Sequence, residues 1–350
     1  MKQFGILLAC CIALAACNNA GSTAANNASG PVYMTMSGPA QGTTFQITFQ
    51  APQEVDYSQQ VDSILRAIDQ SMSTYLDESL ISKFNGGQDS LAIGPDFFKV
   101  LSSAIETGTA TGHAFDVTVM PLVRHWGFHK RDASALDAPL DSAAIDSVHQ
   151  MVGPDGVGFV SVNGRLLICK KRPGVELDFN ALAQGYTVDV LAEYLQRQGI
   201  EDYMVELGGE VRARGQNSKG KLWTIGIDKP VASDASDREL YATVKLDQQS
   251  VATSGNYRKF YERNGVKYAH TIDPRTGYPV LHSLLSATVV APECMDADAY
   301  ATAFMVMGLE AAQAHIEQAS DMEAYFIYSD ENGELQSWMS PGLKAAIQEL

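Results

Sequence analysis

The sequence predicts an α+β fold, because segments with helical periodicity alternate along the chain with segments that have the pattern of strands. Apolar residues follow helical spacing over residues 61–72, at Val61, Ile64, Leu65, Ile68 and Met72. Residues 159–168 alternate around Asn163-Gly164, a dipeptide typical of a type I′ hairpin. No internal repeat and no break in composition divides the chain. We therefore expect one compact unit of mixed sheets and packed helices, either undivided or in two lobes with the active site between them.

Further helices and strands are expected in chain order. A helix begins at Pro95, with Phe98, Leu101 and Ile105 on its inward face. Two later helices are expected from about residue 188 to 197, before Gly199, and from about residue 296 to 319. Strands are expected at residues 203–207, 223–228 and 285–291.

Composition and charge exclude some partners. The chain has 350 residues, of which 45% are hydrophobic, enough to bury a sizeable core. It carries 25 Lys and Arg against 41 Asp and Glu, so the formal net charge is −16. Such a charge repels a phosphate backbone, and we expect no nucleic-acid partner. A small anionic ligand stays possible, because a bound metal ion reverses the field around it.

The N-terminus predicts a lipoprotein. Residues 1–16 combine Lys2 with an apolar stretch that is too short for a permanent membrane helix and suits a signal peptide. The stretch ends in Leu14-Ala15-Ala16-Cys17, which resembles the bacterial lipobox, in which the cysteine is acylated. The alternative is an ordinary signal that leaves Cys17 as a free, reactive thiol.

Residues 17–36 are then a flexible tether, because residues 18–30 include no large apolar side chain. The folded domain is expected at residues 37–350. The sequence thus predicts a membrane-anchored lipoprotein that faces the periplasm or the cell exterior. Within the folded domain only Cys169 and Cys294 remain, and neither has the spacing of a zinc, iron–sulfur or dithiol redox site. A disulfide between them is left open by the sequence.

The chemistry-bearing motifs are dense local segments. The chain has no GxxxxGK[ST] loop, no GxGxxG after a strand, no GxSxG and no HExxH. Instead, Gly, Asp, Thr and aromatic residues gather at residues 112–118, 178–186, 206–210, 253–258, 270–279 and 296–302. With residues 72–75 and 82–85, these segments in this order resemble the ApbE family of FAD:protein FMN transferases. The resemblance spans nearly the whole folded domain. It implies an ApbE-like fold and Mg²⁺-dependent transfer of FMN from FAD to a threonine hydroxyl of a target protein, with release of AMP.

Asp298 and Thr302 are the candidate metal ligands. They stand at i and i+4, so on a helix they project from one face and can offer oxygen ligands to one hard cation. The alternative is that Asp298 only lies near a helix start that Asp296 caps. The resemblance implies that the pair binds Mg²⁺, and that a backbone carbonyl near Ala181 is a further ligand.

His270 is the candidate catalytic residue. It precedes an Asp-Pro-Arg-Thr-Gly turn, and an imidazole whose pKa lies near neutrality can take a proton from an attacking hydroxyl. A lone histidine is also commonly structural, but the resemblance implies that His270 acts at the active site as general base or orienting group. Asp273 either orients the histidine or caps the turn, and we favour the turn.

The resemblance also implies a set of FAD contacts. Asp116 and Asp178 offer acceptor oxygens to adenine or ribose, and Tyr75 offers a ring face for stacking on isoalloxazine or adenine. Taken alone, the two aspartates are as typical of turns and the tyrosine of packing. The other expected contacts are Gln41, Ala114, Phe115, Gln184 and Ile272. Gln41 stands where the family usually has Met, and Gln184 where many members have Lys or Glu, so the pocket differs in detail.

Two rival functions remain open at this point. One is an FAD diphosphatase, in which water attacks at the same site and gives FMN and AMP. The other is a lipoprotein that binds FAD without chemistry. The chain contains no Ser/Thr-Gly-Ala-Thr flavin attachment sequence, so the flavin acceptor is expected to be another protein. The resemblance implies extracytoplasmic redox proteins similar to NqrC or RnfG.

Overall fold

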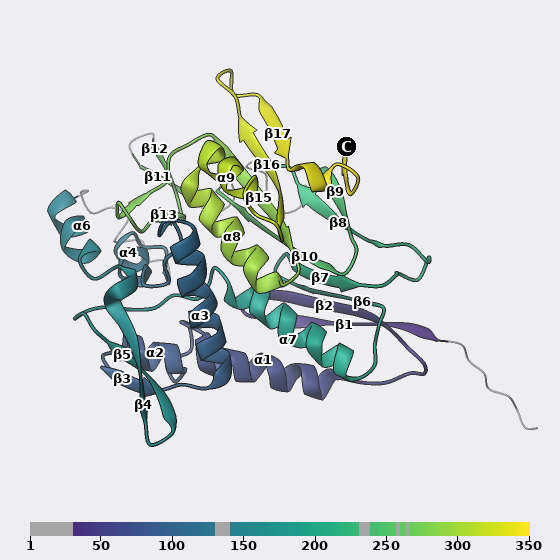
Figure 1. The fold of residues 1–350 in the computed structure, drawn as a ribbon, viewed down its shortest axis with the longest axis horizontal. Helices are drawn as coiled ribbons and strands as arrows, with labels where there is room; N and C mark the ends of the chain where they lie inside the picture. Colours follow the sequence, from purple (N-terminus) through teal and green to yellow (C-terminus); the bar gives the residue numbers. More distant parts are fainter. Residues whose placement is uncertain (1–30, 130–140, 231–238, 257–259, 264–265) are drawn as a thin grey trace, which may run out of the picture.

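An eight-stranded sheet forms the centre of the computed structural model, which describes residues 31–129, 141–230, 239–256, 260–263 and 266–350 (Figure 1). Neighbouring strands in this sheet are antiparallel throughout. Their order across the sheet is β1 (Val32–Ala40), β2 (Thr43–Ala51), β6 (Tyr203–Leu207), β7 (Glu210–Arg214), β10 (Gln249–Gly255), β15 (Leu284–Ala291), β16 (Glu323–Ser329) and β17 (Leu335–Met339).

Four helices pack their apolar sides on the sheet. α1 (Ser58–Met72) and α7 (Ala183–Arg197) bury residues with β2 and β6, while α8 (Cys294–Met307) and α9 (Leu309–Ile316) do so with β10, β15 and β16. A three-stranded sheet of β8 (Trp223–Asp228), β9 (Leu240–Leu246) and β18 (Ile347–Glu349) shares a separate core with β7, β10, β15 and β16. The central strands are therefore buried on both faces.

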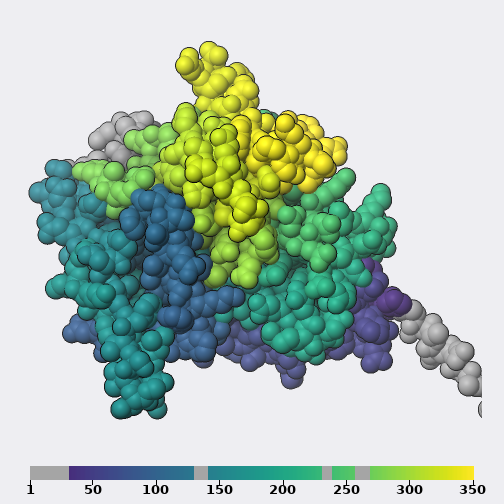
Figure 2. Space-filling view, in the orientation of Figure 1, coloured from purple at the N-terminus to yellow at the C-terminus, as the bar shows by residue number. Residues whose placement is uncertain are grey.

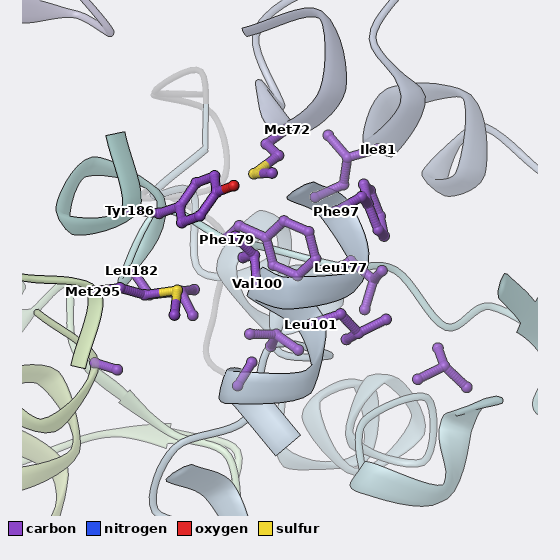
Figure 3. Close-up of a cluster of buried hydrophobic side chains, with 14 of the residues drawn as sticks. Met72, Ile81, Phe97, Val100, Leu101, Leu177, Phe179, Leu182, Tyr186 and Met295 are labelled. Atoms are coloured by element: carbon purple, nitrogen blue, oxygen red, sulfur yellow. The ribbon is translucent and has the colours of Figure 1, made fainter. Parts of the chain in front are cut away.

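The second part of the molecule is mainly helical. It contains α2 (Leu80–Asn85), α3 (Pro95–Ala110) and a small sheet of β3 (Ser90–Ala92), β4 (Val157–Val162) and β5 (Arg165–Lys170). Its core also takes in Tyr186 of α7 and Met295 of α8, which lie near Phe179 and the side chains of α3 (Figure 3). This shared core joins the helical part to the sheet. Figure 2 shows the β4–β5 and β16–β17 hairpins projecting at opposite ends of the molecule.

Shorter elements complete the side where residues 112–129 and 270–280 lie. They are α4 (Met120–His125), α6 (Ser142–His149), β11 (Phe260–Arg263), β12 (Val266–Ala269), β13 (Ile272–Asp273) and β14 (Tyr278–Pro279), with 3₁₀ turns at η1 (Pro154–Gly156) and η2 (Pro341–Leu343). None of the helices in the described ranges combines the length and apolar composition that a membrane span needs.

Most of the expected elements are present, and the α+β class is confirmed. The helix over residues 61–72 is α1, and β6 and β8 have the expected bounds. Asn163 and Gly164 have φ values of 51° and 74°, the left-handed pair that a type I′ turn requires. β1 begins at Val32, before the expected domain start at residue 37, because Tyr33, Met34 and Met36 pack on the core.

Three expectations about helices were wrong. Residues 296–319 do not form one helix: Gly308, at φ 79°, separates α8 from α9. α7 begins at Ala183, a full turn before the expected residue 188. The inward face of α3 is also different, because Phe98 is 39% and Ile105 is 36% exposed. Leu101 is buried as expected, and Phe97, Val100 and Ala104 complete the buried face with it.

Both cysteines of the folded domain are free thiols, so the open question of a disulfide is answered. Cys294 lies buried in the first turn of α8, and Cys169 is half-buried on β5. The predicted signal peptide, the predicted lipidation site Cys17 and most of the predicted tether lie outside the described residues.

Candidate functional site

Asp298 is a buried carboxylate that points at the start of another helix. Its side chain is 6% exposed, and its Oδ2 accepts a hydrogen bond of 3.2 Å from the backbone amide of Gly185. Gly185 lies in the first turn of α7, where amides have no partner within the helix and the helix dipole favours negative charge. Burial nevertheless raises the pKa of Asp298 to about 7. One amide thus compensates the buried charge only in part.

Thr302 follows Asp298 by one turn on α8, as the spacing predicted. Its Oγ1 lies 3.0 Å from the Oγ of Ser254 near the end of β10. Asp296 does not cap α8, because the N-cap position belongs to Glu293. Its carboxylate instead accepts a hydrogen bond from Ser103 of α3, and burial raises the pKa of Asp296 to about 6.

Ala181 lies in the turn just before α7, four residues ahead of the Gly185 amide that binds Asp298. The carboxylate, the Thr302 hydroxyl and a backbone carbonyl in this turn are oxygen donors of the kind that Mg²⁺ prefers. The pKa of Asp298 is raised to about 7 because the Gly185 amide does not fully compensate the buried negative charge, and a bound cation would compensate the remainder. The residues therefore fit a hard divalent cation. Among the described residues no group of three or more His, Cys, Asp and Glu side chains is placed to hold a metal ion.

His270 is tied to the strand that contacts Thr302. The neighbouring Thr271 donates a hydrogen bond of 2.7 Å to the side-chain oxygen of Asn256, and Asn256 follows Ser254 by two residues. The His270 ring is half-buried and lies with its centroid 6.5 Å from that of Phe128. The segment that carries His270 and helix α8 thus both contact residues at the end of β10.

Asp273 has the turn role that the sequence favoured. Its Oδ1 accepts from the backbone amide of Arg275 at 2.9 Å, and both of its oxygens pair with the Arg275 guanidinium. The Asp-Pro-Arg-Thr-Gly turn is fixed further by His149, which hydrogen-bonds the Pro274 carbonyl at 2.7 Å. Asp273 therefore stabilises the turn after His270, and its oxygens are engaged with Arg275.

Asp116 and Asp178 lie on adjacent segments. The Asp178 amide donates to the carbonyl of Val117 at 2.7 Å, which brings the backbone segments that carry the two aspartates together. Asp178 accepts from the amide of Asn180, and Asp116 accepts from the amide and hydroxyl of Thr118. Both are therefore turn residues in this structure. Burial raises the pKa of both carboxyls, that of Asp178 to about 6.

Tyr75 offers an exposed ring. It is 57% exposed and packs on the buried His129, with ring centroids 5.1 Å apart and planes tilted by 34°. Burial raises the pKa of the Tyr75 hydroxyl, and the negative charge of Asp178 adds to that shift. His129 was not among the predicted residues, and a lone histidine after Gly127-Phe128 carried no signal that would have selected it.

Ala114, Phe115 and Ile272 are buried, with exposures of 1%, 4% and 6%. Their side chains belong to three separate hydrophobic clusters. Each residue can therefore contact a ligand through its backbone, while its side chain packs the protein. Tyr75 and the two aspartates, in contrast, can contact a ligand through their side chains.

Gln41 and Gln184 lie together at the start of α7. The Gln184 amide group donates to the Gln41 carbonyl at 3.4 Å, and the Gln41 side chain donates to the Thr187 hydroxyl at 2.9 Å. Glu210, which lies in the motif at residues 206–210 but was assigned no role from the sequence, joins them. A Cβ placed on Gly208 would lie 3.0 Å from its Oε2 and 3.1 Å from Gln184 Nε2. The Gly208-Gly209 turn between β6 and β7 thus leaves room for these polar groups.

A family model for ApbE matches residues 41–326 of the chain. The chain therefore belongs to the ApbE family. Among its ApbE relatives, an FAD:protein FMN transferase of Haemophilus influenzae is 34% identical over 308 residues, which cover 86% of this chain and 88% of the relative. An FAD:protein FMN transferase of Vibrio cholerae is 37% identical over 304 residues, covering 85% and 88%.

Solved structures of ApbE proteins have the same fold. The flavin transferase ApbE from Vibrio cholerae matches with a TM-score of 0.79 at 34% identity, over 90% of this chain and 99% of that one. The ApbE protein of Thermotoga maritima matches with a TM-score of 0.77 at 25% identity, over 91% and 100%. The expected ApbE-like fold is thus confirmed over most of the chain.

Proposed function

We propose that this ApbE-family protein is an FAD:protein FMN transferase that moves FMN from FAD to a threonine hydroxyl of a target protein and releases AMP. The names of its relatives support flavin transfer. The single observation that carries the proposal for this chain is the position of the buried Asp298. Its carboxylate contacts the N-terminal end of α7, and Thr302 lies one turn after it on α8. This arrangement suits a site that must hold both a cation and an anionic phosphate.

Asp298, Thr302 and the Ala181 carbonyl would hold Mg²⁺. When bound, the ion supplies positive charge that neutralises the pyrophosphate of FAD and the charge that grows on departing AMP. The amides of the first turn of α7 add partial positive charge on the same side as Asp298. These residues position the substrate, and positioning with charge stabilisation supplies most of the catalysis in phosphoryl-group transfer.

His270 would act as general base. An unprotonated ring nitrogen takes the proton of the acceptor threonine as the threonine oxygen bonds to the FMN-side phosphorus. The bond from that phosphorus to the bridging oxygen breaks, and its electron pair leaves with AMP. The hydrogen bond of Thr271 to Asn256 and the Asp273–Arg275 turn fix the segment that directly follows the histidine.

The flavin and adenosine parts of FAD would bind at the aromatic and acidic residues. Tyr75 has the exposed ring needed for stacking, and it packs on the buried His129. Asp116 and Asp178 each keep acceptor capacity beyond the turn bonds that they make, because a carboxylate has two oxygens. Gln41 and Gln184 would contact the ligand at the start of α7.

We also propose that the protein is a lipoprotein anchored through Cys17, facing the periplasm or cell exterior. The lipobox-like sequence at residues 14–17 supports the anchor. The acceptors would be extracytoplasmic redox proteins similar to NqrC or RnfG. Expressed with its own signal, the chain should fractionate with membranes and Cys17→Ser should not. Equal membrane binding by both forms would contradict the anchor.

The function is tested by incubating the purified protein with FAD, Mg²⁺ and a candidate acceptor domain. The proposal predicts covalent flavin fluorescence on the acceptor after denaturing electrophoresis, with one AMP released per flavin attached. Free FMN with AMP, and no covalent flavin with any acceptor domain, would show an FAD diphosphatase. FAD binding without any AMP would show a storage protein. Replacing the acceptor threonine by valine is the control for the attachment site.

A further inference from the structure

Two buried aspartates connect α7 and α8 in a reciprocal way. Asp298 of α8 accepts from the amide of Gly185 in the first turn of α7 at 3.2 Å. Asp189 of α7 accepts from the amides of Cys294 and Met295 in the first turn of α8, each at 2.9 Å. In each helix the accepting aspartate stands one turn after the residue whose amide is accepted. We call this arrangement the reciprocal cap.

Neither helix has a capping side chain of its own. The N-cap positions are Leu182 for α7 and Glu293 for α8, and neither side chain makes a capping hydrogen bond. The first amides of a helix need partners, especially when they are buried. The partner helix supplies these acceptors, so the start of each helix is fixed by the position of the other.

The starts of α7 and α8 are closely packed against each other. A Cβ added to Gly185 would lie 2.4 Å from the carbonyl oxygen of Cys294 and 2.8 Å from the Cα of Met295. The backbones of the two helix starts are therefore in direct contact, which only glycine at position 185 allows. A small shift of α8 along α7 would break the hydrogen bonds of both aspartates together.

Asp189 has a buried charge partner. Its side chain is 1% exposed, and Arg212 of β7 contacts its Oδ1 through Nη1 at 2.5 Å. The Arg212 side chain is itself only 19% exposed. The carboxylate thus uses both oxygens for α8 and balances its charge on the central sheet, so α7, α8 and β7 meet at one residue. Burial raises the pKa of Asp189, and the Arg212 guanidinium opposes that shift and orients the carboxylate.

We propose that Asp189 is a positioning residue for the metal site: through the reciprocal cap it fixes α8 against α7, and so sets where the Asp298 carboxylate stands relative to the start of α7. The inference rests on the proposed function, because it assigns Asp298 to Mg²⁺. Residues that orient a metal ligand from behind typically change metal affinity about 10-fold to 100-fold when replaced.

The test compares Asp189→Asn with wild type in the full chain. Asparagine keeps the shape, but its amide group is a donor that would face another donor, either a helix amide or Arg212. Asp330→Asn is the matched control, since Asp330 also accepts two backbone amides, from Asn332 and Glu334, but lies in the β16–β17 turn away from α7 (Figure 1). Two quantities are measured without FAD: Mg²⁺ affinity by calorimetry, and hydrogen exchange of the Gly185 amide by NMR of ¹⁵N-glycine-labelled protein.

For Asp189→Asn we expect roughly 10-fold weaker Mg²⁺ binding with unchanged stoichiometry, and roughly 10-fold faster exchange at Gly185. Asp330→Asn should match wild type in both. A variant that melts at lower temperature but keeps wild-type Mg²⁺ affinity and Gly185 exchange would overturn the proposal, because Asp189 would then be structural only.

A second variant keeps the inference testable if Asp189→Asn does not fold. Arg212→Gln retains a hydrogen-bond donor toward Asp189 and removes the charge, so it should shift both quantities in the same direction by a smaller factor. Wild-type values for both quantities in Arg212→Gln would then overturn the proposal. If the unmodified protein binds no Mg²⁺, the proposed metal site fails, while Gly185 exchange still decides whether Asp189 holds the helices.

Discussion

The hydroxyl oxygens of Thr302 and Ser254 lie 3.0 Å apart, joining α8 to the end of β10. This contact ties the side chain of one proposed metal ligand, Thr302, to the central sheet. Because Asn256 on the same segment binds Thr271, the contact also relates the metal site to His270. The candidate site is thus assembled from helix and strand ends that the central sheet holds in place.

Two substitutions of Thr302 distinguish the effect of its hydroxyl oxygen from the effect of its side-chain volume. Thr302→Ser keeps a hydroxyl for both the cation and Ser254, whereas Thr302→Val keeps the volume and leaves the Ser254 hydroxyl without this partner. We expect Thr302→Val to bind Mg²⁺ roughly 10-fold more weakly and Thr302→Ser to stay near wild type, as measured by calorimetry. Equal affinities for the two variants would show that the hydroxyl is not a ligand.

Replacing His270 should affect the chemical step. His270→Gln keeps polar atoms in the half-buried position but cannot act as a base near neutral pH. We expect the turnover number for transfer to fall by about 10²-fold to 10⁴-fold, with the dissociation constant for FAD unchanged. Pre-steady-state transfer assays and FAD fluorescence titration measure the two quantities. Weaker FAD binding with an unchanged turnover number would show that His270 binds the substrate and is not the general base.

The raised pKa of Asp178 predicts that the free energy of unfolding depends on pH. Burial raises its pKa from 3.8 to about 6, so the folded protein binds this proton more tightly than the unfolded chain does. The stability contributed by Asp178 is therefore greatest below pH 4 or so and falls as the pH rises to about 6. Asparagine stays neutral at every pH, and its oxygen can still accept the amide of Asn180.

The free energy of unfolding of Asp178→Asn, relative to wild type, should therefore rise by about 2 kcal/mol between pH 4.5 and pH 7.5. Urea unfolding at the two pH values measures this difference. Asp116→Asn offers a parallel case, because burial also raises the pKa of Asp116. A difference between Asp178→Asn and wild type that does not change with pH would mean that the pKa of Asp178 is not raised in the folded protein.

Local patterns predicted much of the fold. The Asn163-Gly164 turn, the start of α3 at Pro95 and the α1 stripe depend on residues close in sequence, and all three are present. The face of α3 was mispredicted because Phe97 and Phe98 are adjacent aromatics, and only packing decides between them. Phe97 packs on Phe179, while Phe98 remains on the surface beside Phe159.

The site was predictable to a similar extent. Asp298 and Thr302 have a helical spacing that is visible in the sequence, and the structure places them on one helix. Asp189, Arg212 and Glu210 were missed because their roles come from contacts between elements far apart in the chain. The Gly308 break in α8–α9 was missed because a single glycine within a long apolar pattern is tolerated in many helices.

The most direct test of the Mg²⁺ site measures AMP release and covalent flavin transfer as a function of Mg²⁺ for wild type, Asp298→Asn and Asp296→Asn. Asp296 is the matched control, since it lies two residues away on α8 and bonds Ser103 of α3. We expect Asp298→Asn to lose both products at every Mg²⁺ concentration, while Asp296→Asn follows wild type. Full Mg²⁺-dependent transfer by Asp298→Asn would contradict it.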